Sequence, residues 1–289
     1  MKNILRIVSA ISLLALALGT AALAAPPQQG QQQPAKQPPA PATAPATPAQ
    51  PAAPPVNKEE EDAYVAFINS RRDPLEKQVE LGEAFIQKFP ESRYRETLYS
   101  RLATVYQSQQ VYDKMTAAAD KALELNPDNV DVLSLMGWML PRIAKRNELD
   151  FEQKLVKAEK NSKHAIELIT AMTKPASLSD EEFAKAKNDK LSMAHSGLGM
   201  VYYIKSRVTE AVGAYEQATQ LSAVPDPSDV YMLGEVYARA KRFADAATTF
   251  GKCAEMTWDW QDRCKQSAEQ AKKQAAAQAA PPAPAPPKP

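Results

Sequence analysis

The chain has 289 residues and is almost neutral, with 35 Lys and Arg against 34 Asp and Glu and only nine Gly. This charge balance gives no electrostatic footprint for nucleic acid, so we expect no nucleic-acid partner. The scarcity of Gly and the abundance of Ala, Lys, Glu, Gln and Leu argue against a β-sandwich or a Gly-rich α/β fold and favour an all-α protein.

Residues 1–24 have the pattern of a secretory signal peptide. Two basic residues precede an apolar run from Ile7 to Leu18, and Ala22-Leu23-Ala24 supplies the small residues of a cleavage site. We expect cleavage after Ala24, because cleavage one residue later would place Pro26 directly after the scissile bond. The alternative is an uncleaved anchor over residues 7–25. The prediction is an exported protein, periplasmic or secreted, that meets a membrane only if this segment stays uncleaved.

Both ends of the remaining chain are rich in Pro and Ala. Eleven of the 24 Pro lie between Pro26 and Pro55, and six lie between Pro281 and Pro289. Such segments have too little apolar bulk to offset the entropy of ordering, so we expect a disordered linker over 25–57 and a disordered tail over 279–289. The linker could be a tether or a passive spacer. No Cys precedes Cys253, so no lipid-modified Cys is expected at the signal junction.

Residues 58–278 form the predicted folded domain, and their first two helices are expected over 58–70 and from Asp73 to Lys88. Pro74 suits the first turn of the second helix, and Pro90 follows its end. After these helices, the sequence pattern repeats with a period near 34 residues. Two segments that lie 35 residues apart carry small and bulky residues at the same spacings. They are Leu198-Gly199, Tyr202, Ala211 and Tyr215, then Leu233-Gly234, Tyr237, Ala246 and Phe250.

An earlier segment, with Leu102-Ala103 and Tyr106, follows the same pattern, and these spacings resemble the tetratricopeptide repeat family over roughly residues 75–256. The resemblance implies a right-handed superhelical solenoid of helix hairpins, each made of a helix A and a helix B. A small residue such as Gly199 lets helix A approach helix B closely, and Tyr202 fills the groove one turn later.

One repeat is expected to be irregular, and the last helix closes the array. Gly137 belongs to a further unit of the repeat, but the helix-B pattern of that unit is matched only if extra residues are allowed between its two helices. Pro141 would kink or stop the first helix of this unit. Ser179 and Glu182 form a capping box, so we expect one overlong helix from Ser179 to Lys205. A capping helix is predicted from Asp259 to Gln278.

Cys253 and Cys264 are equally spaced about Trp258-Asp259, the predicted turn before the capping helix. Export would place them where disulfides persist, so they are disulfide candidates; the alternatives are two buried thiols, or one buried and one exposed.

No catalytic constellation is visible in the sequence. The segment from His195 to Gly199 lacks the Gly positions of a nucleophile elbow or a phosphate loop. His164 is the only other His, and neither has a second ligand at metal spacing. We therefore expect no enzymatic activity, no cofactor and no metal, and we interpret His195 as a partly buried residue of a helix A.

The family resemblance also places the helix-A residues that point away from helix B, on the inner curve of the solenoid. Nine of them are predicted to bind a partner: Arg101, Trp138, Arg142, Met200, Tyr203, Tyr231, Met232, Glu235 and Arg239. Their Met and aromatic bulk suits the gripping of a peptide. The alternative is that insertions or neighbouring helices cover these side chains as ordinary core.

The predicted function is a non-catalytic scaffold of the bacterial cell envelope that binds a peptide or protein segment in its concave groove. Short motifs at Phe89-Pro90 and Leu98-Tyr99 are similar to those of bacterial periplasmic repeat proteins that serve envelope assembly. The alternative is a structural, self-assembling module whose inner face is buried in an oligomer.

Overall fold

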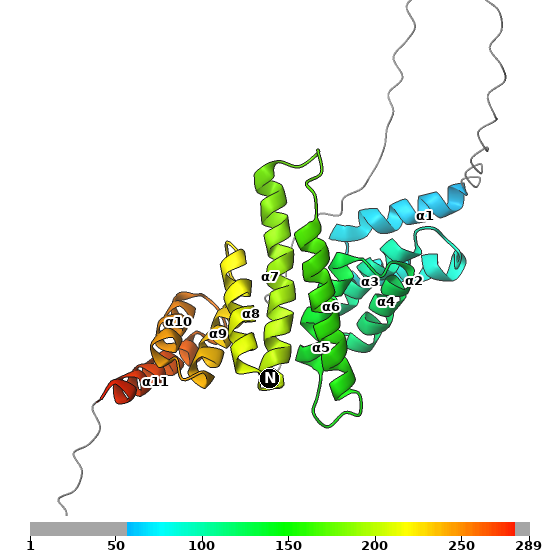
Figure 1. Cartoon of the computed structure of the whole chain (residues 1–289). Helices are drawn as coiled ribbons and strands as arrows, with labels where there is room; N and C mark the ends of the chain where they lie inside the picture. The colour runs from blue at the N-terminus through cyan, green and yellow to red at the C-terminus, as the bar shows by residue number, and fades with distance from the viewer. Residues whose placement is uncertain (1–56, 281–289) are drawn as a thin grey trace, which may run out of the picture. The chain divides into compact units, whose positions relative to one another are not determined.

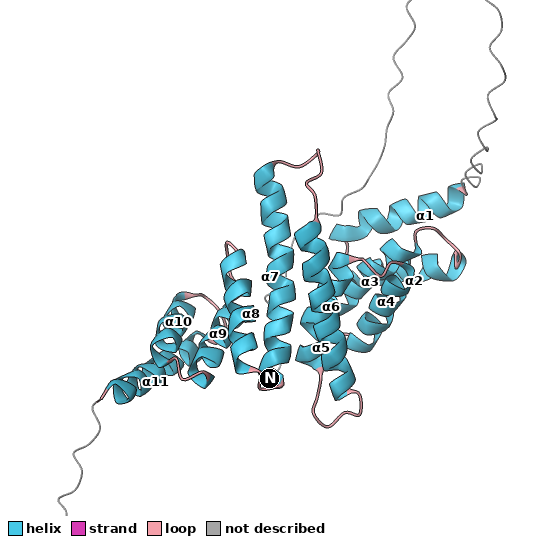
Figure 2. Ribbon diagram, in the orientation of Figure 1, coloured by secondary structure: helices cyan, strands magenta, loops and turns pink. Residues whose placement is uncertain are grey.

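The computed structural model describes residues 57–280, which contain eleven α-helices, one short 3₁₀ turn and no strand (Figure 2). The predicted signal peptide, most of the predicted linker and residues 281–289 lie outside the described residues. The elements are α1 (Lys58–Asn69), η1 (Ser70–Arg72), α2 (Leu75–Lys88), α3 (Arg95–Ser108), α4 (Tyr112–Leu125), α5 (Val130–Ile143), α6 (Phe151–Ala171), α7 (Asp180–Ile204), α8 (Val208–Leu221), α9 (Pro227–Arg239), α10 (Phe243–Glu255) and α11 (Gln261–Ala279).

Consecutive helices pack as hairpins, and each hairpin packs against the next. The pairs are α3 with α4, α5 with α6, α7 with α8 and α9 with α10, and α11 packs on α10. In Figure 1, α6 and α7 stand side by side in the middle of this series. Each hairpin therefore buries its apolar face mainly against its neighbours, as in a solenoid. The prediction of an all-α array of helix hairpins is confirmed.

The helix ends follow from local sequence signals. The Ser179 side chain accepts a hydrogen bond from the Glu182 backbone N at 3.2 Å, and the Glu182 carboxylate accepts one from the Ser179 backbone N at 2.9 Å. This capping box starts α7, a helix of 25 residues. Pro141 lies inside α5, which ends two residues later at Ile143. Asn57, at the end of the predicted linker, instead caps α1 by accepting from the backbone N of Glu59 and Glu60.

The residues of the repeat pattern lie in the core, where small residues meet aromatic rings. A Cβ at Gly199 would lie 2.7 Å from Tyr215, and one at Gly234 would lie 2.6 Å from Phe250. Helix A therefore touches the aromatic ring of its own helix B directly. All thirteen predicted repeat residues are buried: Leu102, Tyr106, Gly137, Leu198, Gly199, Tyr202, Ala211, Tyr215, Leu233, Gly234, Tyr237, Ala246 and Phe250.

Three of the hairpins share one turn geometry between helix A and helix B. A non-Gly residue adopts a positive φ in each turn, and the backbone N of the next residue donates to the carbonyl of a repeat Tyr, as in a Schellman motif. The positive-φ residues are Gln110 at 62°, Ser206 at 58° and Lys241 at 59°. The bonds run from Val111 to Tyr106, Arg207 to Tyr202 and Arg242 to Tyr237. The common turn gives these hairpins a common geometry.

A disulfide joins Cys253 of α10 to Cys264 of α11, and the two Cα atoms lie 5.7 Å apart. Both residues are fully buried. The bond closes the segment that contains Trp258 and Trp260 and holds the start of α11 on the last hairpin.

Candidate partner-binding surface

The nine predicted partner-binding residues lie on α3, α5, α7 and α9, the first helices of four hairpins. Arg101, Arg142 and Tyr231 are the three whose polar groups or rings are most fully engaged by other parts of the chain. Arg101 donates to the carbonyl oxygens of Phe67 and Ile68, and its other nitrogen lies 2.9 Å from Gln78 Oε1. Burial lowers the pKa of Arg101 to about 10, with the charge of Arg71 acting in the same direction. Arg101 therefore anchors α3 to the first hairpin.

Arg142 belongs to a buried polar network that ties three hairpins together. Its guanidinium lies 2.8 Å from Ser196 Oγ on α7 and 3.5 Å from Asp229 Oδ1 on α9. Ser196 in turn donates to Asp229 at 2.6 Å. Burial raises the pKa of Asp229 to about 6, although the charge of Arg142 opposes this shift. The network fixes α5, α7 and α9 relative to one another.

Tyr231 is covered by aromatic residues of the segment between α10 and α11. Only 4% of its surface is exposed, and its ring centroid lies 6.3 Å from that of Trp258 and 5.6 Å from that of Trp260. Its hydroxyl donates to Glu235 at 2.9 Å. The Tyr231 ring is therefore packed as a core residue, which was the alternative expectation, and is not exposed in an open groove.

The other six residues remain partly or fully exposed, and we call them the inner-face row. They are Trp138 on α5, Met200 and Tyr203 on α7, and Met232, Glu235 and Arg239 on α9. The guanidinium carbon of Arg142 lies 4.4 Å from the Trp138 ring, and that of Arg239 lies 3.7 Å from the Tyr203 ring. Stacking of this kind holds both aromatic rings in place.

Three residues that were not predicted as part of the site lie at the C-terminal end of this row, the partly buried Trp258 and Trp260 and the exposed Arg263. Trp258 and Trp260 flank Asp259 with ring centroids 5.6 Å apart, and Arg263 lies over the Trp260 ring at 5.0 Å and the Tyr231 ring at 5.3 Å. Two Trp inside a short segment bounded by Cys were a usable signal. The sequence prediction placed Trp258 in a turn and Trp260 in the capping helix, and assigned neither to the partner-binding surface.

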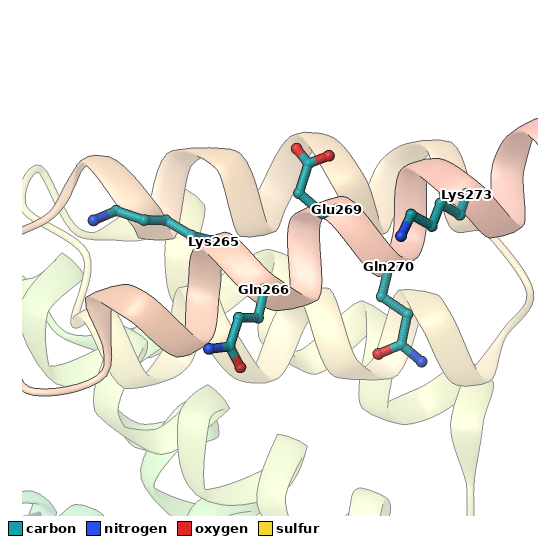
Figure 3. A pocket seen from close by; sticks show the side chains of 5 residues that line it. All are labelled: Lys265, Gln266, Glu269, Gln270 and Lys273. Carbon is teal, nitrogen blue, oxygen red and sulfur yellow. The ribbon is translucent and has the colours of Figure 1, made fainter.

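The outer face of α11 has a different character. A shallow depression there is lined by polar side chains that project from successive turns (Figure 3). They are Lys265, Gln266, Glu269, Gln270 and Lys273. A polar outer face is typical of the terminal helix of a repeat array, because no further repeat covers it.

The two His lie apart and in different settings. His164 Nε2 on α6 lies 2.7 Å from Asp128, whereas His195 lies on α7 and burial lowers its pKa. Within residues 57–280, no group of three or more His, Cys, Asp and Glu side chains is placed to hold a metal ion.

Comparison with known proteins identifies the repeat. The sequence profile of the tetratricopeptide repeat matches residues 96–129, which span the α3–α4 hairpin. The crystal structure of PilW, described as a widely conserved type IV pilus biogenesis factor, has a TM-score of 0.50 and 16% identity, covering 77% of this chain and 94% of PilW. PilF of Pseudomonas aeruginosa has a TM-score of 0.50 and 15% identity, with the same coverage of the two chains. The α3–α4 hairpin is therefore a tetratricopeptide repeat, and the fold of the described residues is similar to that of PilW and PilF.

The matched repeat is less regular than the two repeats that follow the pattern most closely. It has Ala103 where the later repeats have Gly199 and Gly234, yet the profile match falls on it. No curated protein sequence matches the chain. None of the helices between residues 57 and 280 combines the length and the apolar character that a bilayer span requires.

Proposed function

We propose that this protein is a non-catalytic scaffold that binds a segment of a partner protein along the inner-face row. The observation that carries the proposal is the partial exposure of Trp138, Met200, Tyr203 and Met232 on the first helices of three hairpins. Met and aromatic side chains are enriched where proteins bind one another, because they offer large, adaptable contact areas.

The Arg142 network supports this role by making the surface rigid before a partner arrives. It links α5, α7 and α9, the three helices that carry the row, through Ser196 and Asp229. A surface that is already in its binding geometry loses less entropy on association.

A location in the bacterial cell envelope is part of the proposal. It is supported by the signal-peptide pattern of residues 1–24, which lie outside the described residues, and by the two Cys that lie within disulfide distance. PilW, whose fold is similar, is described as a pilus biogenesis factor. We therefore favour a partner that takes part in assembling an envelope structure.

Partner recovery from the envelope tests the proposal. Tagged wild-type protein is crosslinked in the periplasm and compared with Trp138→Ala, Tyr203→Ala and the control Val156→Ala, which removes a side chain on α6 from a residue that is 59% exposed. Recovery should fall by about tenfold or more for the two row variants, as for residues central to an interface, and should be unchanged for the control. An unchanged partner list for all three variants would remove the proposal.

The alternative is a self-assembling module that buries the same row in an oligomer. The partly exposed Trp138 and Tyr203 rings would suit that role equally well. Sedimentation over a range of concentrations separates the two functions. Oligomers that form with concentration and are broken by Tyr203→Ala would favour self-assembly, and a monomer that still binds its partner would favour the scaffold.

A further inference from the structure

Two arginines at the C-terminal end of the inner face have no carboxylate partner among the described residues. Arg239 lies over the Tyr203 ring at 3.7 Å, and its one hydrogen-bond contact with residues 57–280 is a 3.5 Å approach to the Tyr203 carbonyl oxygen. Arg263 lies over the Trp260 and Tyr231 rings. Both arginines are exposed, in contrast to Arg142, which is paired with Asp229. Two guanidinium groups therefore remain available to a partner.

The two arginines lie at opposite ends of one face of α9, Arg239 as the last residue of that helix and Arg263 as a residue of α11 that stacks on Tyr231. Tyr231, Glu235 and Arg239 follow one another at intervals of four residues, so they share one face of the helix. Arg263 stacks on Tyr231 at one end of this face, and Arg239 occupies the other end. Eight residues of α-helix rise by about 12 Å.

Apolar groups and one carboxylate lie between these ends. Met232 is partly exposed one residue after Tyr231, and Trp260 adds a partly exposed indole beside Arg263. The Glu235 carboxylate accepts a hydrogen bond from the Tyr231 hydroxyl, and its charge disfavours a further negative charge at the centre of the strip. We call Arg239, Met232, Glu235, Trp260 and Arg263 the arginine strip.

We propose that the arginine strip binds an extended acidic segment of the partner, with two carboxylates four residues apart and apolar residues between them. Four residues of extended chain span about 13 Å, which matches the rise of α9 between the two ends of the strip. A guanidinium stacked on a ring keeps its N–H groups available, and it can hold a carboxylate through two parallel hydrogen bonds. This inference rests on the proposed scaffold function and adds the chemistry of the partner.

The disulfide helps to hold the α11 end of the arginine strip in place. Cys264 directly follows Arg263, and its bond to Cys253 holds the first turn of α11 against α10. Trp260 and Arg263 are therefore presented by a closed segment rather than by a free helix end.

Two labelled synthetic peptides test the proposal with the mature full-length protein. One peptide contains Glu-Leu-Pro-Leu-Glu, and the other has Gln in place of both Glu. Fluorescence anisotropy should show the Glu peptide binding about tenfold or more tightly than the Gln peptide, and this preference should shrink at high salt. Arg239→Gln and Arg263→Gln should each remove most of the preference.

Arg146→Gln is the matched control. Arg146 is also exposed, lies 5.7 Å from the Phe151 ring and has no carboxylate partner in the part of the chain that the structure describes, but it lies outside the strip. The control should keep the wild-type preference. Equal binding of the two peptides, no binding of either, or an equal loss in Arg146→Gln would overturn the proposal.

Partner recovery separates this inference from the function on which it rests. If Trp138→Ala abolishes recovery and the two arginine variants do not change it, the strip is not the acidic site and the scaffold function stands. If none of these variants changes recovery, both proposals fail.

Discussion

The Tyr237 hydroxyl donates a hydrogen bond to the Glu216 carboxylate at 2.7 Å, across the boundary between two repeats. Glu216 lies on the second helix of one hairpin and Tyr237 on the first helix of the next. Arg242 completes the contact by stacking on the Tyr237 ring at 4.3 Å and pairing with Glu216 at 3.3 Å. The same arrangement recurs where Tyr106 and Lys114 meet Glu83. The repeats are thus joined by a repeated polar contact as well as by apolar packing.

Removal of this contact should weaken the boundary between repeats. Tyr237→Phe and Glu216→Gln should each lower the free energy of unfolding by about 1–2 kcal/mol, and the double variant should reveal a coupling of about 1 kcal/mol. Burial and the hydrogen bond to Glu216 raise the pKa of Tyr237 to about 12. Denaturant unfolding of the wild type, the two single variants and the double variant measures these free energies and the coupling between the two residues.

Tyr202→Phe is the control for this comparison of Tyr237 and Glu216 variants. Tyr202 occupies the equivalent position in the preceding repeat and is equally buried, but its hydroxyl makes no hydrogen bond with any described residue. The change should leave stability nearly unchanged. A loss in Tyr202→Phe as large as that in Tyr237→Phe would show that ring packing, not the hydrogen bond, causes the effect.

Two Gly→Ala substitutions should have opposite effects on stability. Gly199→Ala places a Cβ 2.7 Å from the Tyr215 ring and should cost about 1–3 kcal/mol through overpacking. Gly213→Ala, on α8, meets nothing within 4 Å and should stabilise the helix by about 0.5–1 kcal/mol. Thermal or denaturant melts of both variants check this, and equal effects would contradict the close approach of α7 to α8.

Asp229 should make stability depend on pH in a defined direction. Burial raises its folded-state pKa to about 6 from an ordinary 3.8. Its contribution is therefore fully present below the ordinary pKa and is lost as pH rises through the folded value, by about 3 kcal/mol in total. Relative to Asp229→Asn, the wild type should lose stability between about pH 4 and about pH 7. A difference between the two proteins that does not vary with pH would contradict this.

The disulfide should stabilise mainly the end of the array. Cys253→Ala with Cys264→Ala should destabilise the protein by about 2–3 kcal/mol, and hydrogen exchange should rise first in α11, because contacts in a solenoid are between neighbours. Mass spectrometry of the oxidised, exported protein should find both thiols bonded. Two free thiols in that sample would contradict the pairing.

The hairpins could be predicted from the sequence because their signals are local. The spacing from Gly199 to Tyr215 reports one contact within a hairpin, and Ser179 with Glu182 starts α7 within one turn. The start of α11 was two residues later than expected, at Gln261 rather than Asp259.

The candidate site could be predicted only in part, because its exposure depends on contacts between distant residues. Arg142 and Asp229 are 87 residues apart, so no local pattern indicates that the guanidinium is already paired. Tyr231 was expected to be open, but Trp258 and Trp260 fold back over it from the next helix connection. Family position places a side chain on a face of the helix, whereas neighbouring segments decide whether it remains free.

Site-specific photocrosslinking tests most directly whether the inner-face row binds a partner. A photoreactive amino acid replaces Tyr203 in one variant and Val156, on the second helix of an earlier hairpin, in another, and both are irradiated in intact cells. We expect a discrete crosslinked protein from position 203 that is absent from position 156. Equal crosslinking at the two positions, or none at position 203 in a folded, exported protein, would contradict the account.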